Sequence, residues 1–235
     1  MSRLDDYRSA LLAAIPAVEG VELAQILNAG GGPFVSFVID HGLGPLWHER
    51  TGREEFHDSR LAAEALFLAQ EQALEDIDSA LNDSGIEYAL FKGSANRLLL
   101  FENPALRTCY DLDLLVRFED RIQAASVLAA TGFSAHAEEK SISRELVLTR
   151  GAVDVDLHWG LLREGRLRVD PSIEMLDRRR RVLNTWMLSA EDALFVLLVH
   201  PAFAKQLAGW DMGLHRVADI VFWLRTRSFD RQRLY

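Results

Sequence analysis

The sequence predicts an α+β fold in which a small mixed sheet lies between two helical regions. Three observations predict this order: apolar residues recur at helical spacing up to residue 84, short apolar and alternating runs follow, and helical spacing then returns. We therefore expect an N-terminal helical region over 1–84, an α/β core over 85–165 and a C-terminal helical region over 166–235.

The N-terminal region is expected to be helical because its apolar residues form stripes. The longest stripe runs from Leu61 to Leu81 through Leu66, Leu68, Leu74 and Ile77. It ends where Asn82, Asp83 and Ser84 precede Gly85, a sequence typical of a helix end. A long helix is therefore expected directly before the core.

The core is expected to contain short strands and two helices. Glycine 85 and glycine 93 bound the first strand candidate, and Pro104 prevents the helix after it from continuing. Gly151 favours a hairpin between the last two strands. The expected strands are Ile86–Phe91, Tyr110–Val116, Glu145–Thr149 and Val153–His158, and the expected helices are 94–101 and 120–131.

The C-terminal region is expected to return to helix from Pro171 onward. Ser189 is a good N-cap residue, and Asp192 follows it three positions later. Helices are therefore expected over 190–207 and 214–224.

Composition and charge exclude several protein classes. The chain of 235 residues is 49% hydrophobic and 26% charged, which is typical of a globular protein. Its net charge of −9 disfavours a broad electrostatic grip on nucleic acid. Cys109 is the single cysteine, so no intramolecular disulfide forms. With no signal-peptide pattern and no apolar run of membrane-spanning length, we expect a cytoplasmic protein without membrane contact; the oligomeric state is not indicated.

The first chemical signal is Asp111-Leu112-Asp113 in a predicted strand. Side chains of a strand alternate between faces, so the two aspartates project from one face. Paired carboxylates suit Mg²⁺, which binds one or two of them together with phosphate oxygens. The alternative is a solvent-exposed strand end.

The second signal is the alternating run from Val153 to His158. It places Asp154, Asp156 and His158 on one face, where an aspartate can supply a third metal ligand or a base. The alternative is an ordinary amphipathic edge strand. A zinc site at His158 is disfavoured because no other histidine lies nearby at ligand spacing.

The third signal is Lys92-Gly93-Ser94, where a predicted strand turns into a helix. Glycine allows close backbone approach to a ligand, and free amides at a helix start attract phosphate. Lys92, the Ser94 hydroxyl and Arg107 can add contacts to phosphate, although Arg107 can equally pair with a surface carboxylate. The spacing matches neither a Walker loop nor a dinucleotide-binding fingerprint.

Together these stretches resemble the nucleotidyltransferase superfamily typified by DNA polymerase β. The closer resemblance is to a bacterial group of nucleotidyltransferase family proteins with an "LKG…R…DLDLLV…DLHW" pattern, and it covers most of the chain. The matching residues are Leu90–Gly93, Arg107, Asp111–Val116 and Asp156–Trp159, with flanking similarity at His41–Leu46, Leu188–His200 and Arg216–Ile220.

The resemblance implies transfer of a nucleoside monophosphate from an NTP, such as ATP, to an acceptor, with Mg²⁺ or Mn²⁺ as cofactor and pyrophosphate as product. Asp111, Asp113 and Asp156 would be the catalytic residues and would hold two metal ions. Asp111 and Asp113 would bind the ion that gathers the triphosphate, and Asp156 would share the second ion. Asp154 competes with Asp156, although the "DLHW" match favours Asp156. The phosphate-binding residues would be Lys92, Gly93, Ser94 and Arg107. The acceptor would be a hydroxyl of a small molecule or a protein.

Two other functions fit parts of the sequence. A catalytically idle module that binds a nucleotide or a partner, of antitoxin or biosynthetic-accessory type, would keep the same fold. An aspartyl-phosphate phosphatase would also use an Asp-x-Asp pair, but Leu115 stands where that class has threonine or valine. Nucleic acid is a less favoured partner, with Arg178–Arg181 as the patch that would reverse this judgement.

Overall fold

The structure is a computed structural model that describes residues 3–135, 144–204 and 213–226. These residues divide into two compact units. The first unit contains 3–67, 97–108 and 213–226, and the second contains 68–96, 109–135 and 144–204. Within the described ranges, no helix has both the length and the apolar character needed to cross a membrane.

The first unit is helical throughout. This agrees with the helical spacing of the N-terminal sequence and shows that segments from the middle and the end of the chain join the same unit. Its elements are α1 (Arg3–Leu11), α2 (Gly20–Asp40), α3 (Gly44–Thr51), parts of α4 (His57–Asp83) and α5 (Lys92–Leu100), α9 (His215–Thr226), and the 3-10 helices at Leu12–Ala14, Glu54–Phe56 and Pro104–Leu106.

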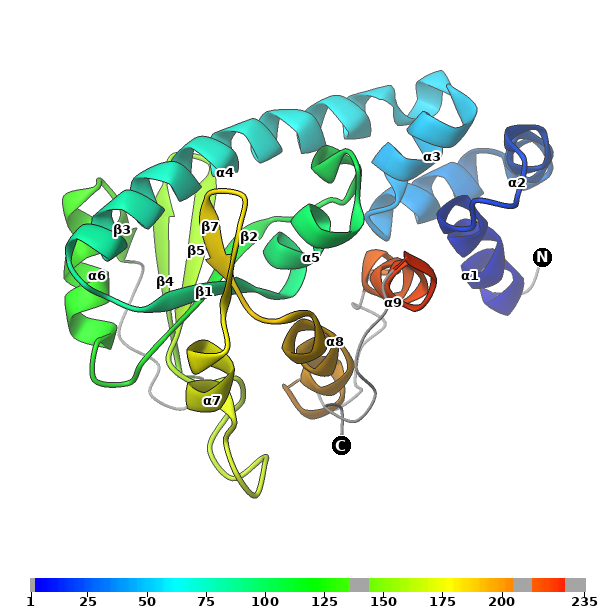
Figure 1. The fold of residues 1–235 in the computed structure, drawn as a ribbon. Helices are drawn as coiled ribbons and strands as arrows, with labels where there is room; N and C mark the ends of the chain where they lie inside the picture. The colour runs from blue at the N-terminus through cyan, green and yellow to red at the C-terminus, as the bar shows by residue number, and fades with distance from the viewer. Residues whose placement is uncertain (1–2, 136–143, 205–212, 227–235) are drawn as a thin grey trace. The chain divides into compact units, whose positions relative to one another are not determined.

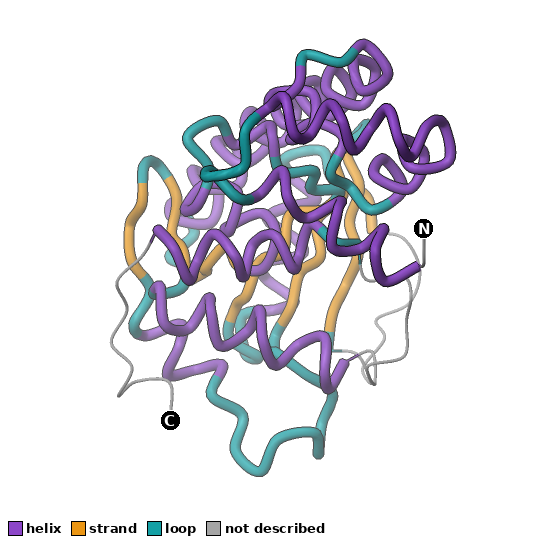
Figure 2. Tube along the Cα trace, turned by 90° about the vertical axis from the view of Figure 1, so that its right-hand side faces the viewer, coloured by secondary structure: helices purple, strands orange, loops and turns teal. Residues whose placement is uncertain are grey.

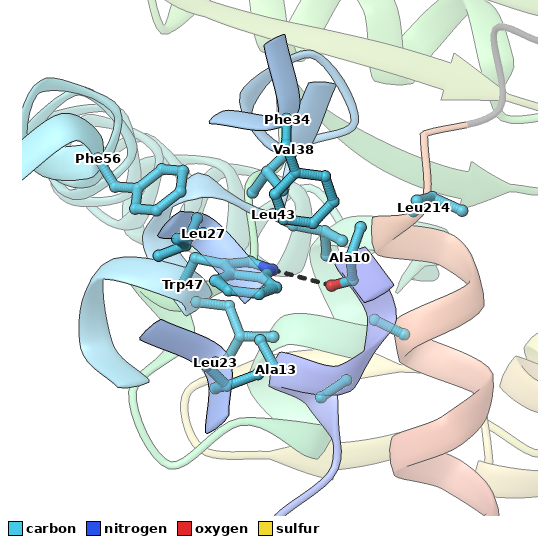
Figure 3. Packing of buried hydrophobic residues seen from close by; sticks show 13 residues of the cluster. Ala10, Ala13, Leu23, Leu27, Phe34, Val38, Leu43, Trp47, Phe56 and Leu214 are labelled. Atoms are coloured by element: carbon cyan, nitrogen blue, oxygen red, sulfur yellow. Dashed lines mark hydrogen bonds between the residues drawn. The ribbon is translucent and has the colours of Figure 1, made fainter. Parts of the chain in front are cut away.

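Trp47 lies at the centre of the first unit's core (Figure 3). Its ring is fully buried and meets Phe34 edge to face, with 5.6 Å between the ring centroids. The indole Nε1 donates a hydrogen bond to the Ala10 carbonyl oxygen at 2.8 Å, so burial of the tryptophan leaves no polar atom unsatisfied. This contact ties α1 to α3.

The second unit contains a mixed sheet, whose strands are labelled in part in Figure 1 and drawn in orange in Figure 2. The strand order is β3-β4-β5-β2-β1-β7-β6. The pairs β2–β5 and β1–β7 are parallel, and the others are antiparallel. The strands are β1 (Tyr88–Phe91), β2 (Asp111–Val116), β3 (Ser134–Ala135), β4 (Glu145–Arg150), β5 (Val153–His158), β6 (Arg180–Val182) and β7 (Thr185–Met187). The expected α+β fold with a small mixed sheet is confirmed.

Helices α6 (Arg121–Ala130), α7 (Ser172–Asp177) and α8 (Ala190–Ala204) belong to the second unit. The Ser189 hydroxyl accepts a hydrogen bond from the Asp192 amide at 3.2 Å, which confirms Ser189 as the N-cap of α8. Residues 205–207 of the expected helix lie outside the described residues.

The hairpin of β6 and β7 corrects the expectation of helix alone after Pro171. Arg178–Arg181 was expected to lie on a helix surface, but α7 ends at Asp177 and β6 begins at Arg180. Each of these strands has three residues, too few for an alternating pattern to stand out against helical spacing. The sheet thus extends beyond the part of the chain in which strands were expected.

One face of β2 is acidic at the start of the strand and apolar near its end. Alternation puts Asp111, Asp113 and Leu115 on that face of β2. Leu115 packs in an apolar cluster with residues of α7 and α8, including Leu176 and Val196. The helices therefore cover the Leu115 end.

Candidate active site

The turn between β1 and α5 is organised by Ser94. The buried Ser94 hydroxyl donates a hydrogen bond to the Phe91 carbonyl oxygen at 2.9 Å and accepts one from the Asp113 amide at 3.3 Å. The side chain thereby ties this turn to β2. Lys92 begins α5 with a φ of 54°, in the left-handed region, and Gly93 follows in the first helical turn. The expected strand-to-helix turn is confirmed.

Next to this turn, three side chains contact one another: those of Lys92, Asp113 and His158. The Lys92 Nζ lies 2.6 Å from the Asp113 Oδ1 and 3.0 Å from the His158 Nε2. The same histidine nitrogen lies 3.0 Å from the Asp113 Oδ1. Asp113 and His158 are each only 3% exposed, so water hardly screens these contacts.

Asp156 joins this group through the strand register. In the parallel pair, Asp113 lies opposite Asp156 and Asp111 lies opposite Asp154. Neighbouring residues on adjacent strands share a face. The register therefore brings together carboxylates from two chain segments that the sequence had placed on separate strands.

The surroundings shift the pKa values of Asp113 and Asp156 in opposite directions. Burial alone would raise the pKa of Asp113, but the Lys92 ammonium and His158 hold it well below its ordinary value. Burial together with the negative charges of Asp113 and Asp111 raises the pKa of Asp156 to about 7. Asp113 is therefore ionised at neutral pH, whereas Asp156 keeps its proton to a higher pH than an ordinary aspartate does.

His158 and Glu145 are site residues that the sequence interpretation missed or gave little weight. Burial, reinforced by the Lys92 charge, lowers the pKa of His158, so its ring is neutral at neutral pH. The His158 Nδ1 lies 3.7 Å from Glu145 Oε2, and the two residues are register partners in the β4–β5 hairpin. The Gly151 turn was the available signal, because a tight hairpin turn fixes which residues face each other.

Three of these side chains could hold a metal ion. Ligand atoms of Asp113, Asp156 and His158 all lie within 4.8 Å of one another. Two carboxylate oxygens suit Mg²⁺, and an added imidazole nitrogen is compatible with Mn²⁺. Asp111 lies on the same face but is not one of the three. The chemistry of this donor set fits a divalent cation.

Arg107 forms an ion pair with Asp219. It belongs to the first unit, where its buried guanidinium donates to Asp219 Oδ1 at 3.2 Å and to Asp219 Oδ2 at 2.8 Å. A third hydrogen bond runs from Arg107 Nη1 to the Thr108 carbonyl oxygen at 2.7 Å. This bidentate pair satisfies much of the guanidinium within the first unit.

Breaking the Arg107–Asp219 pair is expected to destabilise the protein. Either Arg107→Met or Asp219→Asn should lower the free energy of unfolding by about 3 kcal/mol, because each leaves a buried charge without its partner. Urea denaturation at pH 7 measures this loss. The double variant Arg107→Met/Asp219→Leu should recover part of it, and single-variant losses below about 1 kcal/mol would contradict a structural role for the pair.

A family profile matches most of the chain. The profile described as an uncharacterised nucleotidyltransferase covers residues 39–235. The chain belongs to this nucleotidyltransferase family. Membership in this family assigns the chain to nucleotidyl transfer in general. The match also confirms the family resemblance stated from the sequence.

Solved structures with a similar arrangement share little sequence with this member of the uncharacterised nucleotidyltransferase family. The solution structure of the antibiotic-resistance factor ANT(2'')-Ia is 11% identical, with a TM-score of 0.46 over 65% of this chain and 83% of that chain. The crystal structure of ANT(2'')-Ia with adenylyl-2''-tobramycin is 12% identical, with a TM-score of 0.45 over 68% of this chain and 99% of that chain. No curated protein sequence matches the chain significantly.

Proposed function

We propose that this chain is a divalent-metal-dependent enzyme that transfers a nucleoside monophosphate from an NTP to a hydroxyl group of a small-molecule or protein acceptor, with release of pyrophosphate. The observation that carries the proposal is the register of β2 and β5, in which Asp113 and Asp156 lie opposite each other. Family membership supports nucleotidyl transfer independently of this register.

In this proposal Asp111, Asp113 and Asp156 hold the metal, with His158 as a neighbouring donor. Two carboxylates on one face leave room for triphosphate oxygens as further ligands. A bound divalent cation would supply charge neutralisation on the phosphates. Asp154 is left outside the metal group, because its exposed side chain already accepts a hydrogen bond from the Thr149 hydroxyl.

Asp156 is proposed as the base for the acceptor hydroxyl. Without metal, burial and the negative charges of Asp113 and Asp111 raise the pKa of Asp156 to about 7. A bound divalent cation would offset those charges and so favour the ionised carboxylate that a general base needs. The ionised carboxylate can take the hydroxyl proton while Asp113, whose pKa is lowered, stays ionised throughout. The two carboxylates thus have different roles despite their shared chemistry.

The phosphate side is assigned to Lys92 and the amides at the start of α5, including that of Gly93. The Lys92 ammonium contacts Asp113, and Gly93 has no side chain to block an approaching phosphate. Ser94 supports this turn through its hydrogen bonds to main-chain groups. We assign Arg107 a structural role, because contact with phosphate would require its guanidinium to leave Asp219.

The acceptor is proposed to be a small molecule or a protein because three of the four arginines in the Arg178–Arg181 segment are paired with carboxylates. Arg178 pairs with Asp192 at 2.7 Å, Arg179 with Glu87 at 2.9 Å, and Arg181 with Asp78 at 2.6 Å. Guanidinium groups that are already paired with carboxylates contribute little to phosphate binding. The net charge of −9 also disfavours binding to the phosphates of nucleic acid.

No submicromolar affinity for generic RNA or DNA is therefore expected at physiological salt. A fluorescence anisotropy titration with single-stranded and duplex oligonucleotides measures this. Tight binding that disappears when Arg178–Arg181 are replaced by alanine would contradict the proposed acceptor class and favour a nucleic-acid substrate.

The test of the proposed function is metal-dependent binding followed by turnover. Thermal shift with each of the four NTPs should show stabilisation that requires Mg²⁺ or Mn²⁺. Pyrophosphate release with a panel of hydroxyl acceptors should then identify the acceptor. If no NTP stabilises the protein in the presence of either metal, the proposed activity is wrong.

A further inference from the structure

The Lys92 ammonium lies among the atoms that could bind a metal. Its Nζ is 2.6 Å from Asp113 Oδ1 and 3.0 Å from His158 Nε2, and these residues are two of the three in the candidate metal group. A cation bound by the same two atoms would lie within a few ångströms of the ammonium. Two positive charges at that separation repel strongly in a buried site.

The residue type at this position is unusual for the chain. Of its 26 lysines and arginines, three are lysines: Lys92, Lys140 and Lys205. A lysine ammonium is a compact point charge on a flexible stem, whereas an arginine fork binds carboxylates in a bidentate, less easily displaced way. A chain that otherwise relies on arginine thus has a small, movable cation next to its most buried site carboxylate.

The backbone directs Lys92 toward this position. Its φ of 54° places the residue in the left-handed region at the junction of β1 and α5. The Nζ lies 4.9 Å from the centroid of the Phe91 ring, and the same ring meets His158 edge to face at 5.1 Å. Phe91 therefore supports both the ammonium and the imidazole.

We propose that Lys92 is an internal counter-cation that occupies the metal position and must leave it before a divalent cation binds there. The inference rests on the proposed function. The displaced ammonium would be free to contact the incoming triphosphate. Its partner would then be the negative charge of the phosphates, because the bound metal neutralises the carboxylates. Metal alone then competes with Lys92, whereas metal and NTP together do not.

This arrangement predicts opposite effects of one substitution on two ligands. Lys92→Met keeps a similar side-chain length but removes the charge, so Mn²⁺ should bind about tenfold more tightly without nucleotide. The same variant should bind Mn²⁺-NTP more weakly, because the phosphates lose a cationic contact. A residue with a merely structural role would not raise metal affinity. Electron paramagnetic resonance of free Mn²⁺ measures the first effect, and calorimetry measures the second.

Two controls isolate the site. Arg60→Met removes one positive charge from α4, where Arg60 pairs with Glu64, and should leave Mn²⁺ affinity unchanged. Adding Asp113→Asn to Lys92→Met should abolish the gain in Mn²⁺ affinity. Lys92→Met with unchanged or weaker Mn²⁺ affinity would overturn the proposal, and so would the absence of Mn²⁺ binding in both the wild type and Lys92→Met.

Folding of the variant is part of the test. If Lys92→Met is unfolded without metal, Mn²⁺ should restore its circular dichroism spectrum, since the metal replaces the missing cation. A variant that stays unfolded with Mn²⁺ counts against the proposal.

Failure of this inference is distinguishable from failure of the proposed function. A wild type that releases pyrophosphate, with no Mn²⁺ gain in Lys92→Met, refutes the counter-cation alone. A wild type without NTP binding or pyrophosphate release refutes the enzyme assignment.

Discussion

Asp113→Asn is expected to lower the rate of nucleotidyl transfer by about 10³-fold, the scale of losing one key electrostatic contact in an active site. Asp113 is the carboxylate that both Lys92 and His158 contact, and it lies opposite Asp156. Asparagine keeps the shape but removes the charge that a divalent cation needs. Metal-dependent NTP stabilisation should disappear with the activity, and calorimetry with Mg²⁺-NTP measures the binding.

Asp154→Asn is the matched control for this substitution. Asp154 lies on the acid-bearing face of β5, two residues before Asp156, but its carboxylate is exposed and bonded to Thr149. Its amide variant should keep most of the transfer rate and NTP affinity. If Asp154→Asn were inactive and Asp113→Asn retained Mg²⁺-NTP binding, the assignment of the metal ligands would be wrong.

Asp156→Asn is expected to abolish transfer and yet stabilise the metal-free protein at pH 8. The folded state raises the pKa of Asp156 to about 7, so it binds this proton more tightly than the unfolded chain does. Stability from this group is therefore present at low pH and is lost as pH rises from about 4 to about 7. Above pH 7 the ionised carboxylate faces other negative charges, and asparagine removes that repulsion.

The expected gain at pH 8 is about 2 kcal/mol, after allowance for solvent screening of a partly exposed side chain. Urea denaturation of wild type and Asp156→Asn at pH 5 and pH 8, without metal, measures it. The gain should be small at pH 5, where Asp156 is largely protonated. Equal gains at both pH values, or a loss at pH 8, would contradict the raised pKa.

The carboxylate faces were predictable because alternation in a strand is a local property. Asp111 and Asp113 share a face in any strand of that sequence, and so do Asp156 and His158. The residues suggested that the second face could supply a third metal ligand, but they could not establish that the two faces meet, because parallel pairing of β2 with β5 is a tertiary choice. The residue assignments themselves stay predictions until the variants are measured.

The contacts of Lys92 and Arg107 were not predictable from their neighbours in sequence. Lys92 has a left-handed backbone and its ammonium contacts Asp113, and no residue-level pattern indicates that conformation for lysine. Arg107 pairs with Asp219, 112 positions away. The sequence interpretation allowed a carboxylate partner on the surface, whereas the partner found is fully buried.

The parallel pairing of β2 and β5 also determines when the site can exist during folding. Asp113 and His158 are 45 positions apart in the chain, and antiparallel hairpins such as β4–β5 close much shorter loops. Loop-closure entropy makes long-range strand pairing slow relative to hairpin formation. The β4–β5 hairpin is therefore expected to form before Asp113 and His158 come together. Under the proposed function, a divalent cation would therefore bind the finished sheet as a ligand and would not act as a template for its folding.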